Sequence, residues 1–273
     1  MQPSSLAVQG AGHLGTALLE GFLRSRTAPI TVHNRTAARA SNMASRYPEV
    51  RFVERLEAFD QESCPLLLAI PGQAILEIPT DRVSRLSASS RLVVSCCNGL
   101  PLATLEARFP SIRWAKAVPA VTASIGKSVT LVMSSHDAPE LERIFGMVGS
   151  VVRFSMEEEF DRLSPVTSCL PGLLATILHE LGQAFHLSAT ESRDLLAESA
   201  LGTLLLTYSK STSFDELANT VANPGGLTES GASVLRRDLP ELFAAMKQAM
   251  DQRTEQRHRR FAVHETRSDN LPN

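Results

Sequence analysis

Gly10-Ala-Gly-His-Leu-Gly15 is the stretch of sequence that decides the fold. It is a G-x-G-x-x-G motif that directly follows a short apolar run, 6–9, and opens a helical stretch, 16–24. In this context Gly10 allows a tight turn, Gly12 lets the backbone approach a pyrophosphate, and Gly15 lets strand and helix pack closely. The sequence therefore predicts a dinucleotide-binding loop. The alternative is a glycine-rich turn that holds no ligand.

The helix that follows this loop gives an electrostatic reason for the same prediction. Its N-terminus has unpaired N–H groups, and these suit the oxygens of a phosphate. The residues expected to bind the cofactor here are Gly10, Ala11, Gly12, His13, Leu14 and Gly15.

The first half of the chain alternates apolar β-type runs with helical stretches. The β-type runs lie at 6–9, 30–33, 51–53, 65–70, 91–96, 113–118 and 130–134. Strands and helices that alternate in this way form βαβ units with a parallel sheet. We therefore expect an α/β fold class, with a Rossmann-type doubly wound sheet that binds NADP over residues 1–154.

After about Phe154 the pattern becomes helical. Apolar residues at helical spacing predict a helix over 171–186, and the capping boxes Ser188-Ala-Thr-Glu191 and Ser213-Phe-Asp-Glu216 predict two helix starts. Further helices are expected after Thr228 and from near Asp238. The prediction is an all-helical dimerisation domain over 155–263 and a disordered tail over 264–273. Broad apolar faces on these helices favour a homo-oligomer, at least a dimer, over a self-contained bundle.

The end of the second β-type run decides which cofactor is expected. Enzymes that prefer NAD usually carry Asp or Glu about 20 residues past the glycines, where it holds the ribose hydroxyls. This chain has His33-Asn34-Arg35-Thr36, without a carboxylate. Arg35 can pair with a 2′-phosphate, and Asn34 and Thr36 can add hydrogen bonds. NADPH is therefore expected in preference to NADH, with a solvated surface charge as the alternative for Arg35.

A second segment is expected beside the cofactor. Ala69-Ile70-Pro71 ends the fourth β-type run, and ligands of open α/β sheets sit at the carboxyl ends of strands. We therefore expect Ala69, Ile70 and Pro71 to border the cofactor. An ordinary loop opening is the alternative for Pro71.

Composition narrows the class of protein. The net charge of −2 gives no electrostatic reason to expect nucleic acid or an anionic membrane as a partner. The apolar runs are far shorter than the ~20 residues that span a bilayer, and the N-terminus lacks the pattern of a signal peptide. The cysteines form no C-x-x-C pair, and His179 and His186 lack a third ligand, so no metal site is expected. We expect a soluble, cytoplasmic protein with reduced cysteines.

The stretch Asn223-Pro-Gly-Gly-Leu-Thr228 makes the chain resemble a known family. It is similar to the S-P-G-G-x-T signature of pyrroline-5-carboxylate reductases and lies about as far from the C-terminus. Other matches fall in family order and cover most of the chain: the glycine loop, Asn34-Arg35-Thr36, Leu68-Ala69-Ile70, Val94-Ser95 with Asn98-Gly99, Pro119 with Gly126, and Pro240–Arg257. The resemblance implies reduction of 1-pyrroline-5-carboxylate to proline with NADPH or NADH. It also implies a helical domain that interlocks with its twin and a substrate site between the nicotinamide and the partner's helices.

The residues of this loop support the same chemistry. Gly225 and Gly226 let the backbone curve around a small anion, and the N-terminus of the helix that follows suits a substrate carboxylate. A C=N bond is reduced as the protonated iminium, and a hydroxyl near the nitrogen can orient it and relay a proton. Thr228 stands where the family places such a hydroxyl, with a helix N-cap as its alternative role. The expected substrate-binding residues are Asn223, Gly225, Gly226 and Thr228, and Thr228 is the expected catalytic residue.

The chain departs from the family on the substrate side. The family's S-G-S-G-P-A-[YF] stretch appears as Thr167-Ser-Cys-Leu-Pro171-Gly-Leu173, so Ser168 and Leu170 replace both glycines. The family's M-P-N-T-P stretch appears as Val118-Pro-Ala-Val-Thr122, so Ala120 replaces the asparagine next to the nicotinamide. Two alternatives therefore stay open: a reductase of a different imine or carbonyl compound, and a catalytically silent NADP-binding protein.

Overall fold

The computed structural model describes residues 5–25 and 29–268. These residues form two compact units. The sheet unit contains the described residues up to Pro171 and from Thr254 onward, and the helical unit spans Gly172–Arg253.

The sheet unit is built on eight strands within the described residues. They are β1 (Leu6–Gln9), β2 (Ile30–His33), β3 (Arg51–Phe52), β4 (Leu66–Leu68), β5 (Leu92–Ser95), β6 (Arg113–Val118), β7 (Ser128–Met133) and β8 (Gly149–Phe154). Their order is β3-β2-β1-β4-β5-β6-β7-β8, and β6 and β7 form the antiparallel pair among otherwise parallel neighbours. The first six strands have the 3-2-1-4-5-6 order of a Rossmann sheet, which confirms the predicted fold class.

Strand β8 is the one that the sequence did not predict. None of its residues is buried, and it pairs with β7 at the edge of the sheet. An edge strand of this kind does not need the continuous apolar run that marks a strand buried on both faces. The sequence therefore carries little signal for it.

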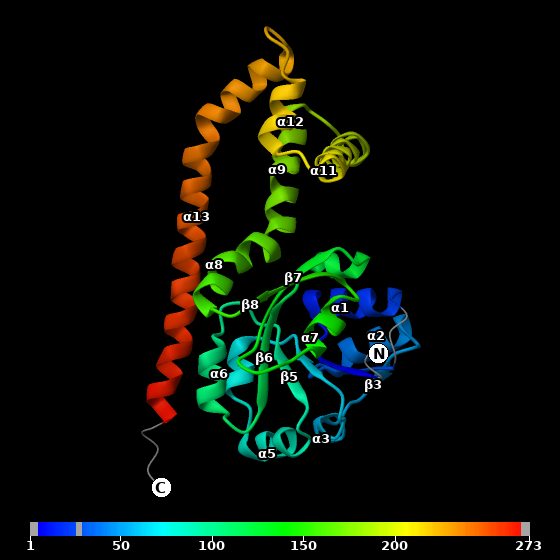
Figure 1. Ribbon diagram of the computed structural model, residues 1–273. Helices are drawn as coiled ribbons and strands as arrows, with labels where there is room; N and C mark the ends of the chain where they lie inside the picture. Colours follow the sequence, from blue (N-terminus) through cyan, green and yellow to red (C-terminus); the bar gives the residue numbers. More distant parts are fainter. Residues whose placement is uncertain (1–4, 26–28, 269–273) are drawn as a thin grey trace. The chain divides into compact units, whose positions relative to one another are not determined.

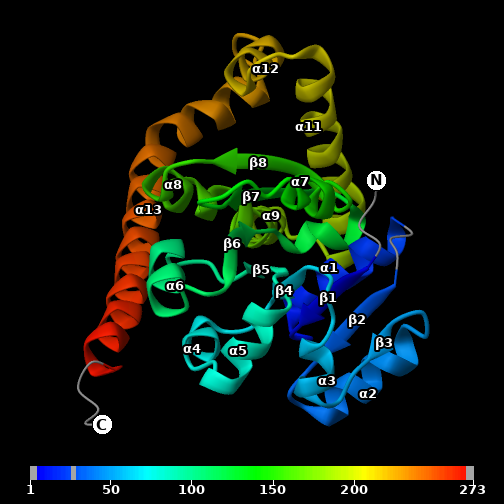
Figure 2. The same cartoon turned by 60° about the horizontal axis from the view of Figure 1, so that its bottom comes forward.

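Helices cover both faces of the sheet (Figures 1 and 2). They are α1 (His13–Arg24), α2 (Ala37–Arg46), α3 (Leu56–Asp60), α4 (Gly72–Leu76), α5 (Thr80–Ala88), α6 (Leu102–Arg108), the 3-10 helix η1 (Val121–Ile125), α7 (Glu140–Phe145) and α8 (Glu157–Ser168). Successive strand residues point to opposite faces, so Leu6 and Val8 of β1 share a core with Phe22 of α1. Ala7 lies in the other core, with Phe59 of α3.

A buried lysine fastens α8 to the sheet. Lys116 of β6 is fully buried, and its Nζ lies 2.7 Å from Oδ1 of Asp161 and 3.1 Å from Oε1 of Glu157. It also lies 4.8 Å from the ring centre of Phe160. A buried ammonium needs such partners because an unpaired buried charge is strongly unfavourable. Helix α8 therefore packs with the sheet unit, although it falls within the helical domain expected at 155–263.

The last turns of the chain's final helix, α13 (Leu227–Ser268), also belong to the sheet unit. Phe261 is buried in the core that contains Phe59. A Cβ added to Gly72 would come 2.7 Å from Cζ of Phe261, so this ring packs directly against the start of α4. The compact units therefore differ at both edges from the expected domains, 1–154 and 155–263.

The helical unit contains the other helices of the chain. They are α9 (Leu170–Ala184), α10 (Ala189–Glu191), the π-helix η2 (Ser192–Ala197), α11 (Glu198–Lys210), α12 (Phe214–Val221) and the first part of α13. Both predicted capping boxes are confirmed. The N–H of Ser188 donates to Glu191 over 2.8 Å, and the N–H of Ser213 donates to Glu216 over the same distance.

The C-terminal part of the chain contradicts the sequence prediction in two ways. One continuous helix replaces the two that were expected to start after Thr228 and near Asp238, with Pro240 inside it. Proline removes one intrahelical hydrogen bond, but the Ala, Leu, Met, Glu, Lys and Gln residues that follow strongly favour helix. The same helix also extends through 264–268, where a disordered tail was expected; residues 269–273 lie outside the described part.

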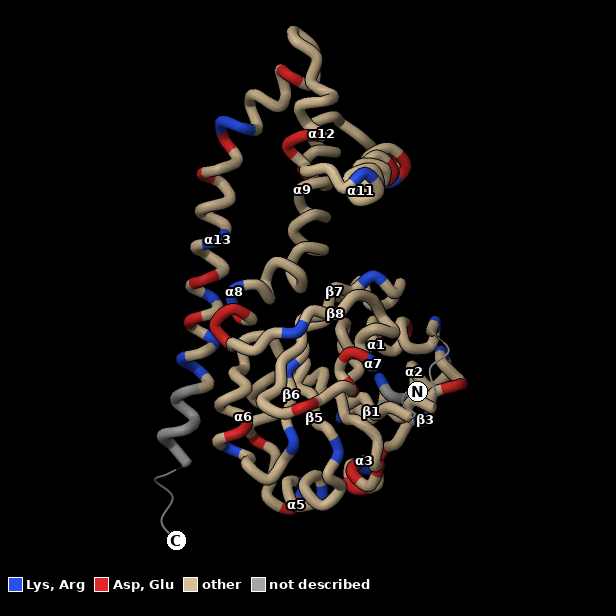
Figure 3. The backbone as a smooth tube through the Cα atoms, in the orientation of Figure 1, with Lys and Arg blue, Asp and Glu red and all other residues tan. Residues whose placement is uncertain are grey.

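Large apolar side chains are exposed on the helical unit. Helix α9 carries Glu180 as its one Lys, Arg, Asp or Glu residue, and α11 carries charge only at Glu198 and Lys210, so both appear mostly tan in Figure 3. The exposed side chains include Ile177, Phe185, Leu201, Leu204, Leu205, Phe214, Val234 and Leu242. Apolar surface of this extent is typical of an interface with another chain.

Candidate active site

The three glycines of the Gly10–Gly15 motif, two before α1 and one in its first turn, meet different steric constraints. Gly10 has a φ of +106°, and a Cβ there would come 2.3 Å from the carbonyl oxygen of Ala69. A Cβ on Gly15 would come 1.9 Å from the carbonyl oxygen of Gly10. A Cβ on Gly12 would meet nothing within 4 Å. The predicted turn at Gly10 and close packing at Gly15 are therefore confirmed, and Gly12 presents open backbone at the N-terminus of α1.

The end of β2 is tied to this loop by the predicted Asn34. Its Oδ1 accepts a hydrogen bond from the N–H of Ala11 over 3.0 Å, and its Nδ2 donates to the carbonyl oxygen of Thr36 over 3.1 Å. The N–H of Gly10 donates to the carbonyl oxygen of His33 over 2.9 Å. The amide of Asn34 therefore holds the glycine loop and the loop after β2 in one arrangement.

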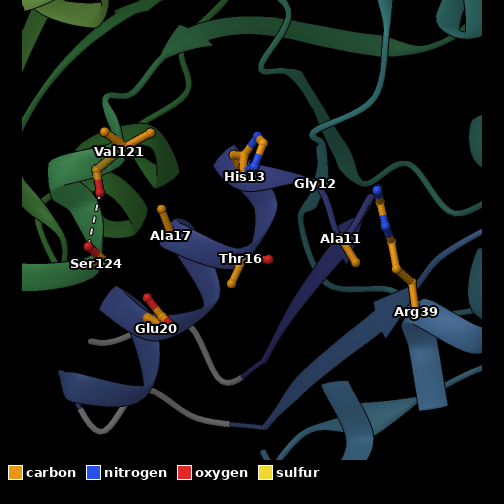
Figure 4. A pocket seen from close by; sticks show the side chains of 9 residues that line it. All are labelled: Ala11, Gly12, His13, Thr16, Ala17, Glu20, Arg39, Val121 and Ser124. Carbon is orange, nitrogen blue, oxygen red and sulfur yellow. Dashed lines mark hydrogen bonds between the residues drawn. The ribbon is translucent and has the colours of Figure 1, made fainter. Parts of the chain in front are cut away.

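A groove runs beside the glycine loop (Figure 4). One part, of about 570 Å³, is lined by Ala11, Gly12, His13, Thr16, Ala17, Glu20, Arg39, Val121 and Ser124. A second part, of about 410 Å³, shares Ala11, Thr16 and Arg39 and adds Thr36, Ala38, Asn42, Met43, Arg46 and Tyr47. We call these two parts together the nucleotide groove. It contains the open N-terminus of α1, the feature from which the sequence predicts a phosphate-binding site.

Arg39 is the groove residue that sequence reasoning missed. It lies in the first turn of α2, and Figure 4 shows its side chain extending alongside the glycine loop. Arg35 is exposed and is not among the residues that line either part of the groove. The sequence signal for Arg39 was its position four residues after Arg35. Arg35 follows the end of β2 and Arg39 lies in the first turn of α2, so both arginines are near the end of β2, where the cofactor is expected.

The far wall of the groove carries a neutralised carboxylate. Glu20 accepts hydrogen bonds from the hydroxyl of Tyr47 and from Nη2 of Arg46, the latter over 3.1 Å. Burial, followed by the hydrogen bond to Glu20, raises the pKa of Tyr47 to about 12. Tyr47 is therefore uncharged at neutral pH. The charge of Arg46 offsets that of Glu20. Arg39 therefore gives the groove a net positive charge, which suits an anion.

The predicted segment after β4 lies against the glycine loop. The N–H of Ala69 donates to the carbonyl oxygen of Gln9 over 2.8 Å. Cγ2 of Ile70 lies 3.0 Å from the position of a Cβ on Gly10, and Pro71 is the N-cap residue of α4. The structure therefore brings Ala69 and Ile70 to the same end of the sheet as the glycine loop. Of the remaining loop residues, His13 is exposed at the groove, whereas Leu14 packs against the core.

The predicted substrate residues form one tight turn in the helical unit. The N–H of Gly226 donates to the carbonyl oxygen of Asn223 over 2.9 Å, and Gly225 has a φ of +72°. The N–H of Gly225 donates to Oε2 of Glu229 over 2.6 Å. Thr228 is exposed and lies second in α13, one residue after Leu227. The N-cap role considered for Thr228 is therefore wrong, because α13 begins before it.

All four cysteines are free, and no group of three or more His, Cys, Asp or Glu residues in the described part is placed to hold a metal ion. Among the helices of the described part, none has both the length and the apolar character needed to cross a membrane.

A doubly wound sheet with an open glycine loop at the N-terminus of its first helix defines a Rossmann-type dinucleotide-binding protein. Residues 5–99 match the family model "NADP oxidoreductase coenzyme F420-dependent". Residues 157–258 match the model "Pyrroline-5-carboxylate reductase dimerisation". Pyrroline-5-carboxylate reductase 3 of Bacillus subtilis (strain 168) is 30% identical over 209 residues, which cover 74% of this chain and 76% of the relative. The chain belongs to the pyrroline-5-carboxylate reductase family.

Solved structures share the fold of this chain. A pyrroline-5-carboxylate reductase from Coxiella burnetii has a TM-score of 0.81 at 20% identity, covering 94% of this chain and 99% of that one. The Plasmodium falciparum pyrroline carboxylate reductase with NADP bound has a TM-score of 0.79 at 16% identity, covering 94% and 99%. The dimerisation match and the exposed apolar side chains of the helical unit together support self-association.

Proposed function

We propose that this chain is an NADPH-dependent oxidoreductase acting on a CH–NH bond, which reduces a small cyclic imine acid in the cytoplasm. The leading substrate is 1-pyrroline-5-carboxylate, and its product is proline. The single observation that carries the cofactor half is the open backbone at Gly12, at a helix N-terminus in a groove that Arg39 lines. Family membership carries the substrate half.

The residues of the groove fit a phosphorylated dinucleotide. Because no side chain lies above Gly12, a pyrophosphate can approach the N–H groups at the start of α1, where the helix dipole favours negative charge. Arg39, with Arg35 nearby in sequence, supplies charge-assisted hydrogen bonds to a 2′-phosphate. Ala69, Ile70 and Pro71 border the same end of the sheet. The bound cofactor supplies the hydride.

The Asn223–Thr228 turn supplies the substrate contacts in this proposal. The first turn of α13 presents N–H groups to the ring carboxylate, and Asn223, Gly225 and Gly226 shape the turn. The Thr228 hydroxyl bonds to the imine nitrogen, orients it and relays a proton as the iminium is reduced. Its exposure in the helical unit is consistent with a residue whose surroundings are completed by the partner subunit.

One observation favours a different imine as the substrate. Ser168 and Leu170 replace two glycines of the family, and the Ser168 hydroxyl donates to the carbonyl oxygen of Ser164 over 2.7 Å and accepts from Asn98 over 3.3 Å. This segment is therefore ordered by side chains that glycines lack. A reductase with an altered substrate preference is the second candidate function.

An NADPH-oxidation assay against a panel of ring sizes tests the proposal. The panel contains 1-pyrroline-5-carboxylate, its six-membered homologue with a ring carboxylate, carboxylate-free 1-pyrroline and a simple α-keto acid. Fastest turnover of the five-membered acid supports the leading substrate, and fastest turnover of another compound supports the second candidate. If no compound is reduced while NADPH still binds, the catalytically silent reading replaces both.

A further inference from the structure

Glu229 places a carboxylate on the loop where the proposed function puts the substrate's own carboxylate. Its Oε2 accepts a hydrogen bond from the N–H of Gly225 over 2.6 Å. The neighbouring N–H, that of Gly226, is also occupied, because it donates to the carbonyl oxygen of Asn223 over 2.9 Å. Both glycine N–H groups that could receive an anion therefore bind oxygens of the chain itself.

The electrostatic consequence depends on the charge of the incoming molecule. Two carboxylates held close together near a protein surface repel each other, and a cation in the same place is attracted. A cyclic imine acid presents a carboxylate and an iminium, whereas a carboxylate-free cyclic imine presents only the iminium. Glu229 therefore repels the ring carboxylate of a cyclic imine acid, whereas a carboxylate-free cyclic imine has no group that it repels.

We propose that Glu229 is a specificity-determining residue that weakens binding of cyclic imines with a ring carboxylate relative to carboxylate-free cyclic iminium ions. The proposal rests on the proposed function, since it takes the Asn223–Thr228 turn as the substrate site. A ring carboxylate that binds the N–H groups of the first turn of α13 meets there the carboxylate of Glu229, which the N–H of Gly225 holds at the same helix start. Glu229 would therefore shift the substrate preference of this chain toward cyclic imines without a ring carboxylate.

A local capping role is the competing explanation. Glu191 and Glu216 make the same kind of backward bond, each accepting from the backbone N–H of a serine three residues earlier over 2.8 Å. Those two bonds stabilise helix starts and involve no substrate loop. Glu216 therefore offers a matched control, because Glu216→Gln makes the same chemical change in a capping bond elsewhere in the helical unit.

The test measures product binding and turnover in the same variants. Proline and pyrrolidine, which differ by the carboxylate, are titrated calorimetrically into the NADP⁺ complex of the full chain. Glu229→Gln keeps an oxygen that can accept from Gly225 but removes the charge. It should tighten proline binding and lower the KM for 1-pyrroline-5-carboxylate by about tenfold, within the range for two like charges near a surface. Pyrrolidine binding, the KM for 1-pyrroline and NADPH affinity should not improve.

The other results separate this inference from the proposed function. Equal changes for both ligands, or the same changes in Glu216→Gln, assign Glu229 to helix capping and overturn the inference. Tighter proline binding by a protein that reduces no imine leaves the inference standing and overturns the reductase. An active enzyme whose affinity for both ligands is unchanged in Glu229→Gln overturns the inference alone. A protein that neither binds proline nor reduces any imine overturns both.

Discussion

The Nζ atom of Lys116 and the Oδ1 atom of Asp161 lie 2.7 Å apart, and the lysine has no solvent-exposed surface. The two residues join the last strand of the Rossmann order, β6, to helix α8. Asp161 keeps 15% of its side-chain surface exposed and is also 3.5 Å from Nε2 of His258, on α13. The pair is therefore asymmetric, since the carboxylate can reach water and the ammonium cannot.

The first prediction follows from that asymmetry. Removing both carboxylates in Glu157→Gln with Asp161→Asn strands a buried ammonium and should destabilise the protein by about 3–5 kcal/mol. Lys116→Met should destabilise it less, because the two carboxylates it leaves behind are partly hydrated. Thermal unfolding of both variants at one protein concentration measures the order. A Lys116→Met variant that is the less stable of the two would show that packing, rather than charge burial, governs this junction.

The second prediction concerns cofactor preference. NADPH should bind more tightly than NADH, and Arg39→Ala should weaken NADPH binding by about 1.5–3 kcal/mol through loss of a charge-assisted contact, with little effect on NADH. Arg35→Asp should reverse or erase the preference. Fluorescence titration of each variant with both cofactors measures the effect.

Arg24→Ala is the control for a general loss of positive charge on the sheet unit. Arg24 is the last residue of α1 and so lies at the opposite end of this helix from the glycine loop. Equal affinity of the unaltered protein for NADH and NADPH would contradict the assignment of these arginines.

The third prediction concerns self-association. The protein should be at least a dimer at micromolar concentration, because the helical unit exposes more apolar surface than an isolated chain usually tolerates. Leu205→Asp on α11 should weaken the dimer, since Leu205 is 58% exposed in the single chain. Ser209→Asp, on the same helix, is the matched control. Sedimentation velocity gives the mass, and a folded monomer of the unaltered protein would refute the shared-site proposal.

The fourth prediction concerns Thr228. Because Thr228 is exposed and is not the N-cap of α13, Thr228→Ala should change stability by no more than about 0.5 kcal/mol. It should nevertheless reduce turnover by roughly 10²-fold, the lower end for a positioned proton donor. NADPH affinity should stay the same. Turnover is measured at saturating NADPH, with cofactor binding measured separately.

Thr228→Ser keeps the hydroxyl and serves as the control, with most of the activity retained. Turnover of Thr228→Ala within about threefold of the unaltered enzyme, on a substrate that is reduced well, would remove Thr228 from the mechanism.

The parts of the fold that the sequence predicted share one physical property. β1, β4 and β5 are covered on both faces, so their residues form continuous apolar runs, and the glycine loop after β1 has the steric constraints that its motif implies. Capping boxes were equally readable, because their donors and acceptors lie three residues apart. Local patterns of this kind can be recognised in the sequence without knowledge of the tertiary structure.

The parts that the sequence did not predict depend on distant contacts. Edge strand β8 has no buried residue, and the place of α8 depends on Lys116, more than 40 residues earlier in the chain. Arg39 becomes a groove residue only when α2 stands beside α1. The continuity of α13 through Pro240 shows that a single breaker does not outweigh many strong helix formers.

The burial of Phe261 against Gly72 has a consequence for how the protein is made. The ribosome emits the Rossmann strands first, and domains often begin to fold during synthesis. One aromatic residue of this core, Phe261, however, lies 189 residues after Gly72 in the chain. The first unit to emerge therefore cannot finish packing until Phe261, late in α13, has been synthesised, and a nascent chain halted within α13 before Phe261 should remain more sensitive to protease than the released protein.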